Sequence, residues 1–261
     1  MVTAGTGQGD ALTMPLVTSL ALVALAAWGV LLVTRRVVRR CAAVLALLAS
    51  LGLLVASAAA LGDLRATVED VERILVQRSV YHLKEADPQC FLLPRLRPAA
   101  KAALTELQYD ELGDGEPDLV HQHLFAQALE AAGLDPGYGA YVDDADEETL
   151  TLNNAISLLC LNRRLVHAAL GHLAAFEATS ALPSADMVRG LQRLGFAEPV
   201  WRYYDEHVEA DAVHEHLARR ICDLATEGDP ALEREVLFGA FVCVDLEDRC
   251  AERLVPTAVP T

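Results

Sequence analysis

The residues best suited to chemistry lie between Asp205 and Glu215, in a stretch rich in histidine and acidic residues. At about 100° per residue of an α-helix, His207, Asp211 and His214 fall on one face, within roughly 60° of one another. Two imidazoles and one carboxylate that converge on a point form half of a site for a transition metal. Such spacing also arises by chance in a long helix, so a metal site needs ligands from other helices.

Candidates for the other half of the site lie on several expected helices. Glu177 lies in an apolar run, where a carboxylate must be paired, neutralised by a pKa shift or bound to metal. Glu111 lies at the end of one expected helix, His121 in the first turns of the next, and Glu85 near the end of the first helix. Each of these residues taken alone is more often a surface or capping residue than a ligand. Together they are the carboxylates and imidazoles that a dinuclear site in a helical bundle requires.

The elements that must position these side chains are all expected to be helices. Apolar periodicity predicts helices over 67–83, 99–111, 118–132, 149–179, 184–194, 198–225 and 230–255. Glycine and proline residues predict breaks over 113–117 and 133–146, and Pro183 is expected to end the long helix over 149–179. No stretch alternates with a period of two residues, so the sequence predicts no sheet.

Two apolar runs without charge, at 16–34 and 41–61, come before these helices. Each run is long enough, as a helix, to cross a hydrocarbon core about 30 Å thick. The basic segment Arg35–Arg40 follows the first run instead of preceding it, which argues against a signal peptide. The predicted organisation is a disordered tail over 1–14, a two-helix transmembrane hairpin over 15–61, a helical domain over 66–255 and a tail over 256–261.

The side of the membrane on which the helical domain lies stays open. The positive-inside rule places the Arg35–Arg40 loop in the cytoplasm, and both termini would then face outward. A redox-active transition metal is more easily maintained inside the cell, where reductants are available, which favours the opposite side. A two-pass membrane protein is expected in either case.

Charge and cysteine usage exclude some classes of protein. Residues 63–261 carry 36 acidic residues and 17 lysines and arginines, a net charge of −19, which repels nucleic-acid phosphates. We therefore expect no nucleic-acid partner. The six cysteines form no CxxC pair, so a zinc ribbon is not indicated. Cys160, Cys222 and Cys243 lie in apolar helical surroundings and are expected in the core.

Residues 68–252 resemble the iron-containing redox enzyme family, a branch of the haem-oxygenase-like diiron oxidases. The matching stretches are RSVYHLKEADP at 78–88, ALTELQYDELGDG at 103–115, GHLAAFE at 171–177 and YDEHVEADAVHE at 204–215, of which the last is the most specific. The resemblance implies an all-α, seven-helix, haem-oxygenase-like bundle that binds two iron ions instead of haem. Here two transmembrane helices stand where members of the family have a soluble helical extension.

The resemblance also implies a ligand set and a reaction. The metal ligands of the family fall on Glu111, His121, Glu177, His207, Asp211 and His214, and members that oxygenate nitrogen have a further carboxylate whose position falls on Glu85. The implied cofactor is two iron ions, Fe²⁺/Fe³⁺, with O2 as co-substrate. The implied reaction is oxidation of a small organic substrate by N-oxygenation or by oxidative C–C cleavage.

Three functions stay open at this point. The first is a membrane-anchored non-haem diiron oxidase or oxygenase, the second a non-catalytic helical membrane scaffold. The third is a mononuclear metal-binding protein or hydrolase that uses only His207, Asp211 and His214. The expected partners are a small-molecule substrate and a membrane, through residues 15–61. An external electron donor and a homodimer are compatible with the sequence.

Further expectations concern the glutamates near His207 and His214 and the histidines outside the predicted ligand set. Metal-bound histidines need acceptors that orient their rings, and Glu206, Glu209 and Glu215 are available for this by position. The remaining histidines have no metal-site context and are expected to be structural or on the surface: His82, His123, His167, His172 and His216.

Overall fold

The computed structural model describes residues 66–254, and within that range it contains helices and turns but no strand. The all-α prediction is therefore confirmed for the described part of the chain. The predicted hairpin over 15–61 and the two predicted tails lie outside the described residues. Within 66–254, no helix is both long enough and apolar enough to cross a bilayer.

Seven helices of eleven residues or more and one of four residues make up the described bundle. In chain order they are α2 (Val68–His82), α3 (Asp87–Cys90), α4 (Pro98–Glu111), α5 (His121–Ala131), α6 (Glu147–Leu161), α7 (Val166–Arg193), α8 (Glu198–Thr226) and α9 (Pro230–Leu254). Short 3₁₀ turns join them: η1 (Leu93–Arg95), η2 (Gly113–Gly115), η3 (Pro117–Leu119), η4 (Val142–Asp144) and η5 (Arg163–Leu165).

The first helix begins at a capping box. The Thr67 hydroxyl accepts a hydrogen bond from the Asp70 backbone N–H, and the Asp70 carboxylate accepts one from the Thr67 backbone N–H. The helix ends at His82, before a turn over 83–86. Pro88 then lies in the first turn of α3, where its missing N–H costs no helical hydrogen bond. It therefore separates α2 from α3 and also favours the start of α3.

The prediction of a single helix over 149–179 is wrong, because the structure has two helices in that range. Helix α6 ends at Leu161, and the Asn162 side chain accepts a hydrogen bond from the Arg164 backbone N–H. Such a local bond to the backbone competes with continuation of a helix. The predicted end at Pro183 is also wrong, since α7 continues through it to Arg193. Proline removes one helical hydrogen bond, and packing of α7 against α8 and α9 outweighs that loss.

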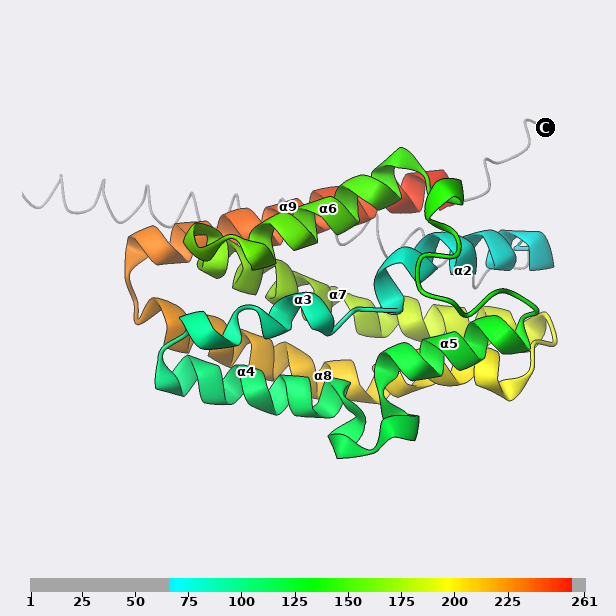
Figure 1. The fold of residues 1–261 in the computed structure, drawn as a ribbon, viewed down its shortest axis with the longest axis horizontal. Helices are drawn as coiled ribbons and strands as arrows, with labels where there is room; N and C mark the ends of the chain where they lie inside the picture. The colour runs from blue at the N-terminus through cyan, green and yellow to red at the C-terminus, as the bar shows by residue number, and fades with distance from the viewer. Residues whose placement is uncertain (1–65, 255–261) are drawn as a thin grey trace, which may run out of the picture. The chain divides into compact units, whose positions relative to one another are not determined.

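Helix α7 is the centre of the bundle, with α8 and α9 packed against it (Figure 1). Its crossing with α9 is very close. A Cβ atom on Gly171 would lie 1.8 Å from the Val236 carbonyl oxygen, and one on Gly239 would lie 1.7 Å from the Ala168 carbonyl oxygen. The two glycines therefore let the backbones approach to a distance that no other residue type permits.

Helices α4 and α5 follow one another along α8, with the loop over 112–120 between them (Figure 1). Two apolar clusters fill the bundle. One packs the first half of α7 against the last half of α8, together with α4 and α6, and includes Leu107, Leu170 and Ile221. The other packs α2 and α5 against the opposite halves and includes Leu191 and Tyr203. The middle of α7 and α8, between the two clusters, is where buried polar residues gather.

Candidate metal centre

One turn and four helices bring the candidate ligands to the middle of the bundle. Glu85 lies in the turn after α2, and Glu177 lies at the middle of α7. Glu111 is the last residue of α4, and His121 is the first residue of α5. His207 and His214 lie on α8, and the side chains of all six residues are buried. The structure therefore collects six of the seven residues that the sequence predicted as ligands.

The seventh predicted ligand is Asp211, which lies on α8 between His207 and His214. Its side chain is outside the described part of the structure. The role expected for Asp211 therefore stays a prediction.

The loop between α4 and α5 depends on Gly113 to join Glu111 and His121. Gly113 has a φ angle of +69°, a backbone conformation that favours glycine. A Cβ atom there would lie 2.6 Å from the Val120 backbone nitrogen, so the loop folds back against itself only with glycine at this position. This compact turn places the end of one helix beside the start of the next.

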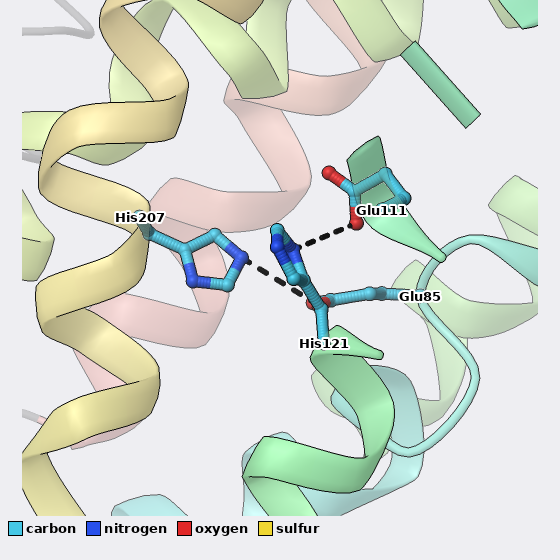
Figure 2. A group of neighbouring side chains, drawn as sticks. All are labelled: Glu85, Glu111, His121 and His207. Atoms are coloured by element: carbon cyan, nitrogen blue, oxygen red, sulfur yellow. Dashed lines mark ion pairs between the residues drawn. The ribbon is translucent and has the colours of Figure 1, made fainter. Parts of the chain in front are cut away.

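One group of ligand atoms comes from Glu85, Glu111, His121 and His207, and all four lie within 4.8 Å of one another. Glu85 Oε1 is 3.5 Å from His207 Nε2 and 3.9 Å from His121 Nδ1. Glu111 Oε2 is 3.1 Å from His121 Nδ1. Figure 2 shows the four side chains converging from α4, α5, α8 and the turn after α2.

A second group consists of Glu111, Glu177 and His214, again with ligand atoms within 4.8 Å of one another. His214 Nδ1 is 3.4 Å from Glu111 Oε1 and 3.2 Å from Glu177 Oε2. Glu111 belongs to both groups, with one carboxylate oxygen directed to each. Glu111 is therefore the residue that the two groups share.

The donor atoms fit iron, because carboxylates and imidazoles are ligands that iron accepts. Glu85 Oε1 and His121 Nδ1 are buried and have no partner in hydrogen-bonding geometry, although other donor atoms lie close by. An unpaired buried polar atom costs about 1–3 kcal/mol. A cation between these atoms removes that cost and also offsets the mutual repulsion of the three buried glutamates.

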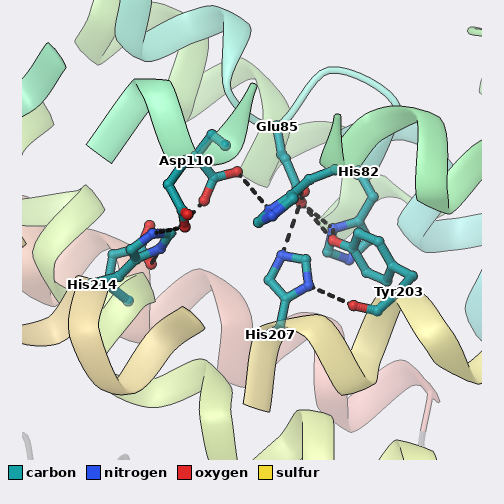
Figure 3. A network of polar contacts seen from close by, with 9 residues as sticks. His82, Glu85, Asp110, Tyr203, His207 and His214 are labelled. Atoms are coloured by element: carbon teal, nitrogen blue, oxygen red, sulfur yellow. Dashed lines mark hydrogen bonds and ion pairs between the residues drawn. The ribbon is translucent and has the colours of Figure 1, made fainter. Parts of the chain in front are cut away.

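A hydrogen-bonded triad holds the second oxygen of Glu85. The Tyr203 hydroxyl lies 2.6 Å from Glu85 Oε2 and 2.6 Å from His82 Nδ1, and His82 Nδ1 lies 2.8 Å from the same oxygen (Figure 3). Both neighbours can donate to Oε2, which leaves Oε1 to face His121 and His207. The sequence predicts His82 only as a structural or surface residue, whereas the structure buries it beside Glu85. Its position three residues before Glu85 was the available signal.

The rings of the two α8 histidines are oriented by acceptors that sequence reasoning also missed. His207 Nδ1 donates to the Tyr203 carbonyl oxygen at 2.7 Å, which leaves Nε2 for Glu85 and its group. His214 Nε2 lies 2.5 Å from Asp110 Oδ2, which leaves Nδ1 for the second group (Figure 3). Glu206 and Glu215, which were available by position, are exposed, and the Glu209 side chain lies outside the described residues.

Neighbouring acidic and imidazole groups in this cluster shift one another's pKa values. Burial acts to lower the pKa of His214, but hydrogen bonds to Asp110 and Glu177 outweigh it and raise the pKa to about 11. Burial acts to raise the pKa of Glu85, but the nearby His207 and His82 imidazoles outweigh it and hold the pKa well below its usual range. This environment therefore favours the ionised form of Glu85 and the protonated form of His214.

A cavity opens beside the two groups. Its volume is about 10 Å³, room for about one water molecule. Its walls include Glu85, Glu111, Glu177 and His207 on one side and apolar side chains such as Phe176 on the other. A water molecule in this space would lie directly against the candidate ligands.

Comparison with solved structures shows where this fold occurs elsewhere. Two crystal structures of a CADD-like protein of unknown function from Nostoc punctiforme match the chain with TM-scores of 0.59 and 0.57 and identities of 17% and 18%. Each match covers 73% of this chain, with 85% and 80% of the other chain. No curated protein matches the chain.

Two family models match the sequence. A model described as tryptophan-associated transmembrane protein matches residues 6–103, which contain the predicted hairpin. This match supports an association of the N-terminal region with a membrane. A model described as iron-containing redox enzyme matches residues 72–248, which contain every candidate ligand. The chain therefore belongs to the iron-containing redox enzyme family, an oxidoreductase family, and has its haem-oxygenase-like fold.

Proposed function

We propose that this protein is a membrane-anchored non-haem diiron oxidase or oxygenase that uses O2 to oxidise a small organic substrate. The observation that carries the proposal is the position of Glu111, whose two carboxylate oxygens face two separate groups of ligand atoms. Residues 15–61 provide the membrane anchor, and an external electron donor returns the site to its reduced state.

Each iron ion has a defined set of ligands in this proposal. Glu85, Glu111, His121 and His207 hold one ion, and Glu111, Glu177 and His214 hold the other, with Asp211 as a further ligand. Four carboxylates balance two ferrous ions in charge, which suits a buried site. When bound, the iron ions supply the electrons that activate O2 for N-oxygenation or oxidative C–C cleavage.

The surrounding residues keep this ligand set in place. His82 and Tyr203 hold Glu85 Oε2, so that Glu85 presents a single oxygen to the site. The Tyr203 carbonyl fixes the tautomer and ring orientation of His207, and Asp110 does the same for His214. The two apolar clusters pack on either side of the site, with the small cavity beside it.

A mononuclear hydrolase that uses only the α8 residues has less support. Such a site needs His207 and His214 to converge on one ion, whereas among the described residues the two imidazoles belong to different groups. A non-catalytic scaffold does not account for unpaired ligand atoms buried at the bundle centre.

Iron stoichiometry of the purified full chain in detergent tests the proposal. We expect two iron ions per chain after anaerobic loading with Fe²⁺. His207→Ala and His214→Ala are each expected to lose one ion, and Glu111→Ala is expected to lose both. His216→Ala is a matched control on the same helix, because His216 is exposed and belongs to neither group.

Two results would contradict the diiron assignment. One is a chain that binds no iron, and the other is a single ion that is insensitive to replacement of Glu111 and Glu177. The membrane anchor is tested separately, by alkaline carbonate extraction of membranes from cells expressing the full chain or a chain without residues 15–61. Extraction of the full chain into the soluble fraction would refute the anchor alone.

A further inference from the structure

A hydrogen bond connects the candidate metal centre to the molecular surface. His214 belongs to the second group of ligand atoms, and its Nε2 lies 2.5 Å from Asp110 Oδ2 (Figure 3). The Asp110 side chain is 45% exposed, whereas that of His214 is 2% exposed. Glu85, by contrast, is held by His82 and Tyr203, which are both buried. The surface around Asp110 is therefore one side chain away from a candidate ligand.

Four exposed apolar side chains lie around Asp110, and we call them the apolar patch. Their exposed fractions lie between 40% and 65%. Three of them are no more than nine residues from Asp110 in the chain, and the fourth is next to His214, whose ring contacts Asp110. In chain order they are Tyr109, Leu112, Leu119 and Val213. Exposed apolar side chains that gather in this way mark an interaction site, whereas scattered ones are ordinary.

The rim of the apolar patch is acidic. Three exposed acidic residues of the loop over 112–120 form no ion pair with any described residue: Asp114, Glu116 and Asp118. On the facing part of α8, Arg220 is already paired with Glu106 at 3.6 Å. The chain therefore leaves the negative charge of this loop unbalanced. Such a surface is complementary to a partner with a positively charged rim.

A small apolar patch with a charged rim suits a short-lived encounter between two proteins. Electron-transfer complexes bury little surface, and opposite charges on the two partners bring them together quickly. The donor must also come close to the metal centre, because the rate of electron transfer falls steeply with distance. Asp110 and His214 provide a short path from this surface to the second group.

We propose that the apolar patch and its acidic rim dock a small electron-donor protein that carries positive charge around its redox group. This inference rests on the proposed function, because the adjacent iron site uses the electrons. Each encounter transfers one electron from the donor. Two encounters therefore convert two Fe³⁺ ions into two Fe²⁺ ions, and two donor molecules are each oxidised by one electron.

Binding of cytochrome c to the full chain in a non-ionic detergent tests the docking surface. Native cytochrome c is a basic protein with an exposed haem edge, and succinylation of its lysines reverses its charge. We expect the native form to bind more tightly at low ionic strength. A loop variant that combines Asp114→Asn, Glu116→Gln and Asp118→Asn should weaken this binding about tenfold, because three exposed ion pairs are lost. Asparagine tolerates the positive φ angle of Asp114.

A second triple variant with the same change in charge is the matched control. It combines Asp143→Asn, Asp144→Asn and Glu147→Gln, which are exposed residues at η4 and the start of α6, away from the loop over 112–120 (Figure 1). This variant should change the affinity by less than about twofold. Tyr109→Ser should weaken binding about threefold to tenfold, whereas Tyr138→Ser, at another exposed tyrosine, should not.

Reduction of the oxidised, iron-loaded chain tests the electron path. The reductants are the methyl viologen radical, which is a cation, and the radical of a sulfonated viologen, which is an anion. The loop variant should be reduced by the cation about threefold more slowly than the unmodified chain, and the anion should show no such loss. The control variant should be reduced at the unmodified rate by both. Iron content should be the same in all of these chains.

Several results would overturn the inference. Equal binding of native and succinylated cytochrome c would do so, and so would an equal loss of affinity in the two triple variants. Unchanged cytochrome c affinity in Tyr109→Ser would exclude the apolar patch. Unchanged reduction of the loop variant by the cation would exclude electron entry at this surface. Failure of the proposed function appears separately, as absence of iron from the same samples.

Discussion

Replacement of Tyr203 by phenylalanine removes one hydroxyl from the triad that holds Glu85. This hydroxyl is buried and lies 2.6 Å from Glu85 Oε2, while Glu85 Oε1 faces His121 and His207. Without it, Oε2 keeps only the His82 hydrogen bond, and the carboxylate is less firmly held before metal binds. The free energy needed to order Glu85 must then come from metal binding.

The expected size of the effect follows from the charge of the acceptor. A hydrogen bond to a charged group contributes about 1.5–3 kcal/mol, and each 1.4 kcal/mol corresponds to about tenfold in affinity. We therefore expect Tyr203→Phe to weaken binding of one iron ion by about tenfold to hundredfold. The ion held by Glu177 and His214 should keep its affinity, because Tyr203 does not contact that group.

The neighbouring residue supplies the control. Tyr204 is also buried, but its hydroxyl has no hydrogen-bond partner. Tyr204→Phe should therefore leave both iron affinities unchanged and should not lower the stability of the metal-free protein. Anaerobic competition titration against a chromophoric chelator measures both affinities in each variant. Thermal unfolding of the metal-free chains checks that both variants fold.

Two outcomes would refute the reasoning about Glu85. The first is a Tyr203→Phe variant whose two iron affinities stay within about twofold of the unmodified protein. The second is a Tyr204→Phe variant that loses as much affinity as Tyr203→Phe. The second result would mean that replacing any tyrosine in this part of α8 disturbs the site by repacking.

Three further predictions concern pH and packing. Hydrogen bonds outweigh burial and raise the pKa of His214 to about 11, so a metal ion that binds there must displace a proton. Iron affinity measured by competition titration should therefore rise by up to about tenfold per pH unit between about pH 6 and 8. The rise should be smaller in the Asp110→Asn variant. Burial lowers the pKa of His172 from 6.5 to about 4, so the unfolded chain binds more protons and stability falls as pH decreases through this window. Urea unfolding should show that His172→Phe removes about 3 kcal/mol of that acid sensitivity; an unchanged pH dependence would contradict the assignment. Gly171→Ala should destabilise the fold by at least about 3 kcal/mol in thermal unfolding, because the new Cβ would lie 1.8 Å from a backbone oxygen of α9.

Helix positions near the C-terminus were largely predictable from periodicity. The predicted helices over 198–225 and 230–255 agree closely with α8 and α9. The error over 149–179 has a local cause and a tertiary one. Asn162 ends α6 through its own side chain, whereas Pro183 is accommodated because α7 packs along its length against two other helices. Apolar periodicity continues across both positions, so it could not distinguish them.

The α8 motif shows a similar limit. The spacing of His207 and His214 predicted a common face, and both side chains do face the bundle centre. Spacing could not show that His207 would use Nε2 in one group and His214 Nδ1 in another, because the Tyr203 carbonyl and Asp110 decide which ring nitrogen is free. A hydrogen bond to one nitrogen of imidazole determines which nitrogen remains for a metal.

Residue types and periodicity were enough to predict the helical class and to identify the carboxylate and imidazole residues available for a metal, and they also predict the membrane hairpin. These properties follow from residue type and local periodicity, which every stretch of chain carries independently. Helix packing, by contrast, brings Glu111 against two groups at once and places His82, Tyr203 and Asp110 where they support those groups. These contacts join residues up to 121 positions apart in the chain, and their geometry depends on how α4, α5 and α8 pack, which no local pattern encodes.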